Sequence, residues 1–118
     1  MTSMRPETPA LIWDAKCAAD AILRFVDGMV RSEFNDDLLV RSAVERQFEI
    51  LGESLKRLRS SAPGAAAEIP DIHRIIAMRN VIAHEYGEID YSILWAVITT
   101  RLEDLRSRLD ELLRKHGG

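Results

Sequence analysis

The sequence is poor in residues that cross-link or interrupt a fold: it has one cysteine, four prolines and six glycines in 118 residues. Cys17 cannot form an internal disulfide, which suits a reducing cytoplasm. Because alanines surround it on a helical stripe, we predict a buried, inert thiol. Long apolar runs are also missing, so the sequence predicts neither a signal peptide nor a membrane span, and we expect a soluble, cytoplasmic protein.

Motifs for metals and cofactors are lacking too. The chain has no HExxH sequence, no cysteine–histidine cluster, no glycine-rich phosphate loop and no serine-hydrolase motif. We therefore predict no metal site and no cofactor. The net charge of −3 argues against a broad basic surface, so any interaction with RNA would depend on a local positive field.

What the sequence does contain is helical periodicity. Apolar residues recur at three- and four-residue steps in four segments, and no segment alternates with period two. We predict an all-α, antiparallel four-helix bundle, a single domain over residues 1–118 with its core at about 8–115. The predicted helix starts are Thr8-Pro9, Asp36 or Asp37, Pro70-Asp71, and Asp90. The first helix is expected to end at Gly28 and the polar run 31–35, the second at Pro63-Gly64, and the third at Tyr86-Gly87, with a linker over 65–69.

Polar residues gather where the third predicted helix ends. Arg79 and Asn80 are followed by His84, Glu85 and Tyr86. An arginine five positions before a histidine means little alone, and the helix dipole favours a histidine in a last turn without any function. Polar side chains gathered at a helix end are nevertheless typical of sites. From the residues alone, a structural and a functional interpretation both stay open.

The functional interpretation has a consistent chemistry. RNA cleavage needs a base for the 2′-hydroxyl proton and an acid for the leaving 5′-oxygen, and histidine titrates in the right range. It also needs a cation against the phosphate oxygens, which a planar guanidinium supplies. Because the 2′-hydroxyl is the nucleophile, no metal is required and DNA is not a substrate.

Helix geometry constrains how Arg79 and His84 could act together. Asn80 and His84 lie four residues apart on one stripe, whereas Arg79 lies about 140° around the axis from His84. One undistorted helix cannot aim both side chains at the same phosphate. Either the helix breaks before His84, or a second copy in a two-fold dimer supplies the missing half.

At these residues the chain resembles the HepT-like branch of the HEPN superfamily. The hallmark of that branch, Arg-Asn-x-x-x-His-x-Tyr, is matched at Arg79, Asn80, His84 and Tyr86. The resemblance covers roughly residues 10 to 113, and further matching segments are Ala43-Val44-Glu45-Arg46, Ile50-Leu51-Gly52-Glu53-Ser54, Ile89-Asp90-Tyr91 and Ile93-Leu94-Trp95.

The resemblance implies a homodimeric HEPN-type bundle with Arg79 and His84 of both copies in one composite cleft, and Asn80 in a supporting role. It implies an endoribonuclease toxin of a type VII-like toxin–antitoxin pair. Its antitoxin would be a minimal nucleotidyltransferase of the MNT type that silences it by AMPylating Tyr86. A modified Tyr86 would place bulk and negative charge two residues from His84. The alternative is a non-catalytic HEPN subunit that binds a nucleotidyltransferase partner or nucleotide.

Two features outside the motif also allow two interpretations. Glu45, Glu49 and Glu53 repeat every four residues, which is typical of a solvated salt ladder. Alternatively, Glu53 approaches Arg79 or a partner chain and orients it, and Gly52 in mid-helix indicates a close helix–helix contact there. Arg74 is either a solvated helix charge or a guide for RNA entering the cleft.

Overall fold

The structure is a computed structural model that describes residues 7–84 and 90–116, without the side chains of positions 80, 81, 83, 84 and 116. These ranges contain helices and no strand, which confirms the all-α class. The described residues form six helices rather than four: α1 (Glu7–Phe25), α2 (Arg31–Asp36), α3 (Leu38–Ser61), α4 (Pro63–Ala66), α5 (Ile72–His84) and α6 (Tyr91–His116).

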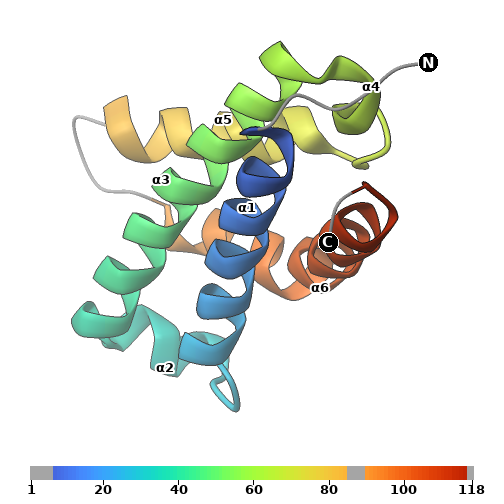
Figure 1. Ribbon diagram of the computed structural model, residues 1–118. Coiled ribbons are helices and arrows are strands. Elements are labelled where there is room, and N and C mark those ends of the chain that lie inside the picture. The colour runs from blue at the N-terminus through green and yellow to red at the C-terminus, as the bar shows by residue number, and fades with distance from the viewer. Residues whose placement is uncertain (1–6, 85–89, 117–118) are drawn as a thin grey trace.

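The four long helices are α1, α3, α5 and α6, and the other two pack against the pair formed by α1 and α3. α1 and α3 run antiparallel and side by side, α6 packs on α1, and α5 packs on α3. In Figure 1, α5 crosses one end of the α1–α3 pair rather than running along it. This crossing places the arginine of the motif against the C-terminal half of α3.

A continuous apolar core holds these helices together. The buried residues of α3 and α6 recur at three- and four-residue steps, and burying each leucine contributes roughly 1.5–3 kcal/mol. α1 presents mainly small residues to the same core, so the neighbouring helices can approach it closely. The core residues of these three helices are Ile12, Ala15, Ala18, Ala19 and Ile22 of α1; Val44, Phe48, Leu51, Leu55 and Leu58 of α3; and Leu94, Ile98, Leu102, Leu105, Leu109 and Leu112 of α6.

The two short helices, α2 and α4, lie where the sequence predicted the end of a helix and a linker. The polar run 31–35 does not end α1, which stops at Phe25, but forms α2. α2 is held by Phe34, which is fully buried with its ring centroid 5.2 Å from that of Trp95. α4 begins with proline at its first position and includes the start of the predicted linker.

Two expectations for α1 are wrong. α1 already includes Glu7, so Thr8 lies inside the helix instead of capping it. The Thr8 hydroxyl is buried with no hydrogen-bond partner among the described residues. Cys17 is exposed rather than buried, because at about 100° per residue it lies on the opposite side of α1 from the buried Ala15 and Ala19.

Two predicted helix caps are confirmed. The Asp37 carboxylate accepts a hydrogen bond from the backbone N–H of Val40 at 3.0 Å and caps α3. The Asp90 carboxylate accepts from the backbone N–H of Ser92 at 3.0 Å at the start of α6, and the bonds from Ser92 lower the Asp90 pKa. The third helix begins at Ile72, directly after Asp71, whose φ of 59° is left-handed.

In the described part of the chain, no helix is long and apolar enough to cross a membrane.

Removing the α3 cap should lower stability. Asp37→Ala leaves the N–H of Val40 without its side-chain acceptor, so we expect the free energy of unfolding to fall by about 1 kcal/mol in urea denaturation. Asp36→Ala is the matched control, because Asp36 is the exposed last residue of α2 and caps nothing. Equal losses in the two variants would contradict the assignment of the cap.

Candidate active site

Arg79 is the described residue at the centre of the candidate site. It lies on α5 and its side chain is 28 % exposed. The neighbouring backbone on α3 is Gly52, and a Cβ built on Gly52 would lie 2.5 Å from the Cβ of Arg79. That distance is shorter than real Cβ atoms tolerate, so only glycine permits α5 to pass here. The close helix–helix contact expected at Gly52 is confirmed.

Glu53 binds Arg79 from the position next to this contact. Its Oε1 lies 3.1 Å from Nη2 of Arg79, and its Oε2 lies 3.2 Å from Nε of Arg57. One carboxylate therefore holds two guanidinium groups, one from α5 and one from its own helix. The sequence analysis considered an approach of Glu53 to Arg79, and the structure contains it. Because the pair is partly solvated, its contribution to stability is modest.

These side chains line a groove of about 530 Å³ between α1, α3 and α5. Its charges balance: Asp14, Glu49 and Glu53 are acidic, and Arg46, Arg57 and Arg79 are basic. Arg79 has five N–H donors in a planar fork, so the ion pair with Glu53 leaves donors for a phosphate. The full lining is Leu11, Asp14, Arg46, Glu49, Ile50, Glu53, Ser54, Arg57 and Arg79.

The remaining motif residues fall outside the described part. The side chains of Asn80 and His84 and all of Tyr86 lie there, as does Ile89. The helix itself is informative, because α5 runs unbroken from Ile72 to His84. Of the two alternatives raised by helix geometry, a break before His84 is therefore ruled out. Within one chain, positions 79 and 84 face directions about 140° apart.

A second polar contact lies on the other side of the motif. The Tyr91 hydroxyl, at the start of α6, donates to Oε2 of Glu45 at 2.8 Å. The guanidinium of Arg41 lies 4.5 Å from the centre of the Tyr91 ring, in cation–π range. Burial raises the pKa of Tyr91, and the hydrogen bond and charge of Glu45 add to this against the opposing charge of Arg41. Sequence analysis missed this contact, because nothing local links residues 45 and 91.

The glutamate series on α3 therefore has specific partners. Glu45 accepts from Tyr91, Glu49 lies 3.5 Å from Arg46, and Glu53 binds Arg57 and Arg79. The interpretation as a solvated salt ladder fits only Glu49, whose ion pair is with a residue of its own helix. The outer two hold both ends of the stretch 79–91, which contains the motif.

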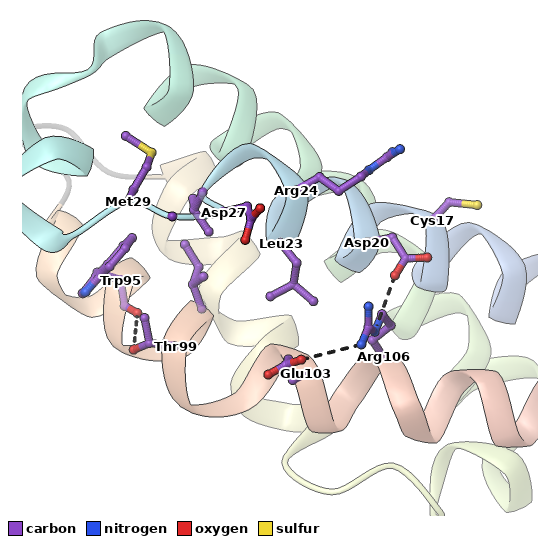
Figure 2. A pocket seen from close by; sticks show the side chains of 13 residues that line it. Cys17, Asp20, Leu23, Arg24, Asp27, Met29, Trp95, Thr99, Glu103 and Arg106 are labelled. Atoms are coloured by element: carbon purple, nitrogen blue, oxygen red, sulfur yellow. Dashed lines mark hydrogen bonds and ion pairs between the residues drawn. The ribbon is translucent and has the colours of Figure 1, made fainter.

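Another pocket lies between α1 and α6. Its volume is about 720 Å³ and no motif residue lines it. Figure 2 shows Arg106 between Asp20 and Glu103, at 3.6 and 3.7 Å, with Leu23, Met29 and Trp95 on the apolar side. Of the two cations that line this pocket, Arg24 and Arg106, Arg106 is thus already paired with carboxylates of the protein. Within residues 7–84 and 90–116, no group of three or more His, Cys, Asp or Glu side chains is placed to bind a metal.

Comparison with known proteins gives a consistent family. A family model described as "Ribonuclease HepT-like" matches residues 15–112. A Methanocaldococcus jannaschii protein named "Putative RNase MJ1380" is 23 % identical over 88 % of this chain and 94 % of its own length. "Putative RNase TTE0752" of Caldanaerobacter subterraneus subsp. tengcongensis is 29 % identical over 80 % of this chain and 83 % of its own length. No solved structure gives a significant match.

Gly52→Ala should separate α3 from α5. Neither Cβ can rotate away, so we expect the free energy of unfolding to fall by about 1–3 kcal/mol, although alanine favours a helix over glycine by about 1 kcal/mol. Gly64→Ala is the matched control, because a Cβ there meets nothing within 4 Å. Denaturant titration of both variants tests this, and equal stability would contradict the close contact.

The Tyr91–Glu45 bond should give a recognisable pH dependence. Since the folded pKa of Tyr91 is raised above 10.0, its contribution to stability is complete below pH 10 and is lost as pH rises through the folded value. We expect wild type to be more stable than Tyr91→Phe at neutral pH, and the difference to shrink above pH 10. Urea midpoints across this range measure it, and a difference that grows with pH would contradict the bond.

Proposed function

Since the chain belongs to the HepT-like ribonuclease family, we propose that it is a metal-independent endoribonuclease whose active site forms between two copies of the chain. The observation that supports this most directly is the placement of Arg79. Gly52 and Glu53 hold it in a groove, on a helix that continues to His84. An arginine that was only solvated on the helix surface would not require a glycine on the neighbouring helix, as Arg79 requires Gly52.

In the proposed reaction, the 2′-oxygen of the RNA forms a bond to phosphorus while the bond to the 5′-oxygen breaks. One His84 takes the 2′-hydroxyl proton, and a second His84 gives a proton to the leaving 5′-oxygen. Arg79 stabilises the charge on the phosphate oxygens. The products are a 2′,3′-cyclic phosphate and a 5′-hydroxyl, so the steps balance without water or metal.

The need for two copies follows from the unbroken helix. Because positions 79 and 84 face about 140° apart on α5, a single chain does not direct both at one phosphate. A two-fold axis beside α5 would bring Arg79 of each copy opposite His84 of the other. The same arrangement supplies the two histidines that base and acid roles require.

Glu53 acts in this proposal as a positioning residue. It fixes Nη2 of Arg79 at 3.1 Å and leaves the rest of the guanidinium fork for phosphate. It also offsets positive charge before substrate arrives. Asn80, one residue after Arg79 on α5, would orient His84.

We further propose that this enzyme is the toxin of a type VII-like pair with a minimal nucleotidyltransferase antitoxin. The antitoxin would transfer AMP from ATP to the Tyr86 hydroxyl and release pyrophosphate. The added phosphate would compete with RNA for Arg79 and block the cleft. A cytoplasmic location accords with this role, since RNA and ATP are both available there.

One observation favours the alternative of a non-catalytic subunit. The groove around Arg79 is balanced in charge, with three acidic and three basic side chains. Such a groove suits a protein partner as well as it suits RNA. The two functions differ in their dependence on His84, because partner binding should survive its loss.

Expression in a bacterial host tests the proposal. Wild type should arrest growth and degrade RNA, and His84→Ala should abolish both, since loss of a general acid or base costs about 10²–10⁴ in rate. Purified wild type should cut RNA in EDTA and leave 5′-hydroxyl ends. His116→Ala, at the end of α6, is the matched control and should behave as wild type. Harmless wild type that leaves RNA intact would overturn the catalytic proposal.

A further inference from the structure

Positive charge is concentrated around α5 although the protein is acidic overall. The chain has 16 lysines and arginines against 19 aspartates and glutamates. Residues 54–84 reverse this balance, with five basic and two acidic residues. α5 itself has two arginines, two histidines and no acidic residue. This stretch of the chain therefore has a local excess of basic residues next to the motif, although Arg57 and Arg79 pair with Glu53.

Three of these cations have no carboxylate partner among the described residues. Lys56, Arg59 and Arg74 form no ion pair there, whereas every described lysine and arginine of α6 forms one. Because the protein has more acidic than basic residues, a shortage of carboxylates does not explain why these cations form no ion pair. They are available for an anion from outside.

Two of these cations, Lys56 and Arg59, follow the line where α3 meets α5, whereas Arg74 lies about 140° around α5 from Arg79 and outside this line. Gly52, Lys56 and Arg59 are four and seven residues apart and so share one face of α3. Gly52 meets Arg79, and Nη1 of Arg59 lies 2.8 Å from Nδ1 of His73. The contacts thus come in opposite order along the two crossing helices, with Lys56 between them on α3. We call this line the α3–α5 seam: Lys56, Arg59 and His73.

The Arg59–His73 contact brings two basic side chains together. A guanidinium only donates, so Nδ1 of His73 accepts and Nε2 carries the ring proton. The pair then presents N–H donors and no free acceptor. Residues 54–84 also contain no Phe, Tyr or Trp, so the large aromatic rings on which bases stack best are missing from the seam. Such a surface suits phosphate groups rather than bases.

We propose that the α3–α5 seam binds the phosphodiester backbone of single-stranded RNA and leads the strand to Arg79. This inference rests on the proposed function. The seam covers about 10 Å of α3 between positions 52 and 59 at 1.5 Å per residue, a span that a few nucleotides cross. Contacts to phosphate position the strand and do not read its sequence.

Salt dependence of binding tests the seam directly. The probe is a short fluorescein-labelled 2′-O-methyl oligonucleotide, which cannot be cleaved through its 2′-oxygen. The variant Lys56→Gln/Arg59→Gln removes both cations of the seam. Each lost phosphate contact should reduce the slope of log K against log salt by about 0.7, so we expect a slope smaller by about 1.4, measured by anisotropy.

Two controls separate the seam from general charge and from folding. Arg108→Gln/Arg114→Gln removes the same charge from α6 and should leave the slope unchanged. Arg59→Lys keeps the cation but not the guanidinium fork that contacts His73, and it should retain the slope as well. Circular dichroism of each variant checks that it is folded.

The outcomes distinguish this inference from the proposed function when cleavage of unmodified RNA is followed in parallel. If wild type cleaves RNA but the slope does not change in the seam variant, the proposed role of the seam alone is overturned. A partner with an acidic surface would then be the occupant of the seam. A seam-dependent slope without cleavage would support the seam and overturn the catalytic proposal. No binding and no cleavage by wild type would overturn both.

Discussion

The approach of α5 to α3 at Gly52 is the contact on which the rest of the site depends. Because position 52 has no Cβ, the Arg79 side chain starts against the α3 backbone. At that separation the neighbouring Glu53 reaches the guanidinium of Arg79. Nearly two turns further along α3, Arg59 reaches His73. A larger side chain at position 52 would push α5 outward and lengthen all of these contacts together. Glycine is unfavourable within a helix, and here its cost is offset by the position it gives to Arg79.

α3 organises the site through its carboxylates. Like charges four residues apart destabilise a helix slightly, yet Glu45 and Glu53 each bind a residue from another helix. Their partners are Arg79, which is the first residue of the motif, and Tyr91, which follows the motif in the chain. α3 therefore holds both flanks of the stretch that contains His84 and Tyr86, and the cost of placing acids in series is offset by contacts that a neutral helix surface could not make.

The charge distribution explains how an acidic protein could act on RNA. The groove around Arg79 is balanced, so it does not attract anions strongly by itself. The adjacent seam has two cations without a carboxylate partner among the described residues, while each described lysine and arginine of α6 pairs with a carboxylate. Our proposal therefore assigns attraction and chemistry to neighbouring surfaces. In it, the balanced groove keeps Arg79 oriented, and the seam would supply the field that brings a phosphate chain to it.

The sequence by itself determined the helical class, the four long helices, a cap at Asp36 or Asp37, the cap at Asp90 and the position of the motif at the end of α5. All of these depend on interactions within about one helical turn, which the periodicity of 3.6 residues displays directly. Tertiary structure alone decided that Cys17 is exposed, that the run 31–35 forms a helix around the buried Phe34, and which partners Glu45 and Glu53 bind. Those outcomes join residues that lie far apart in the chain, because they depend on where one helix crosses another, and no local pattern encodes that crossing.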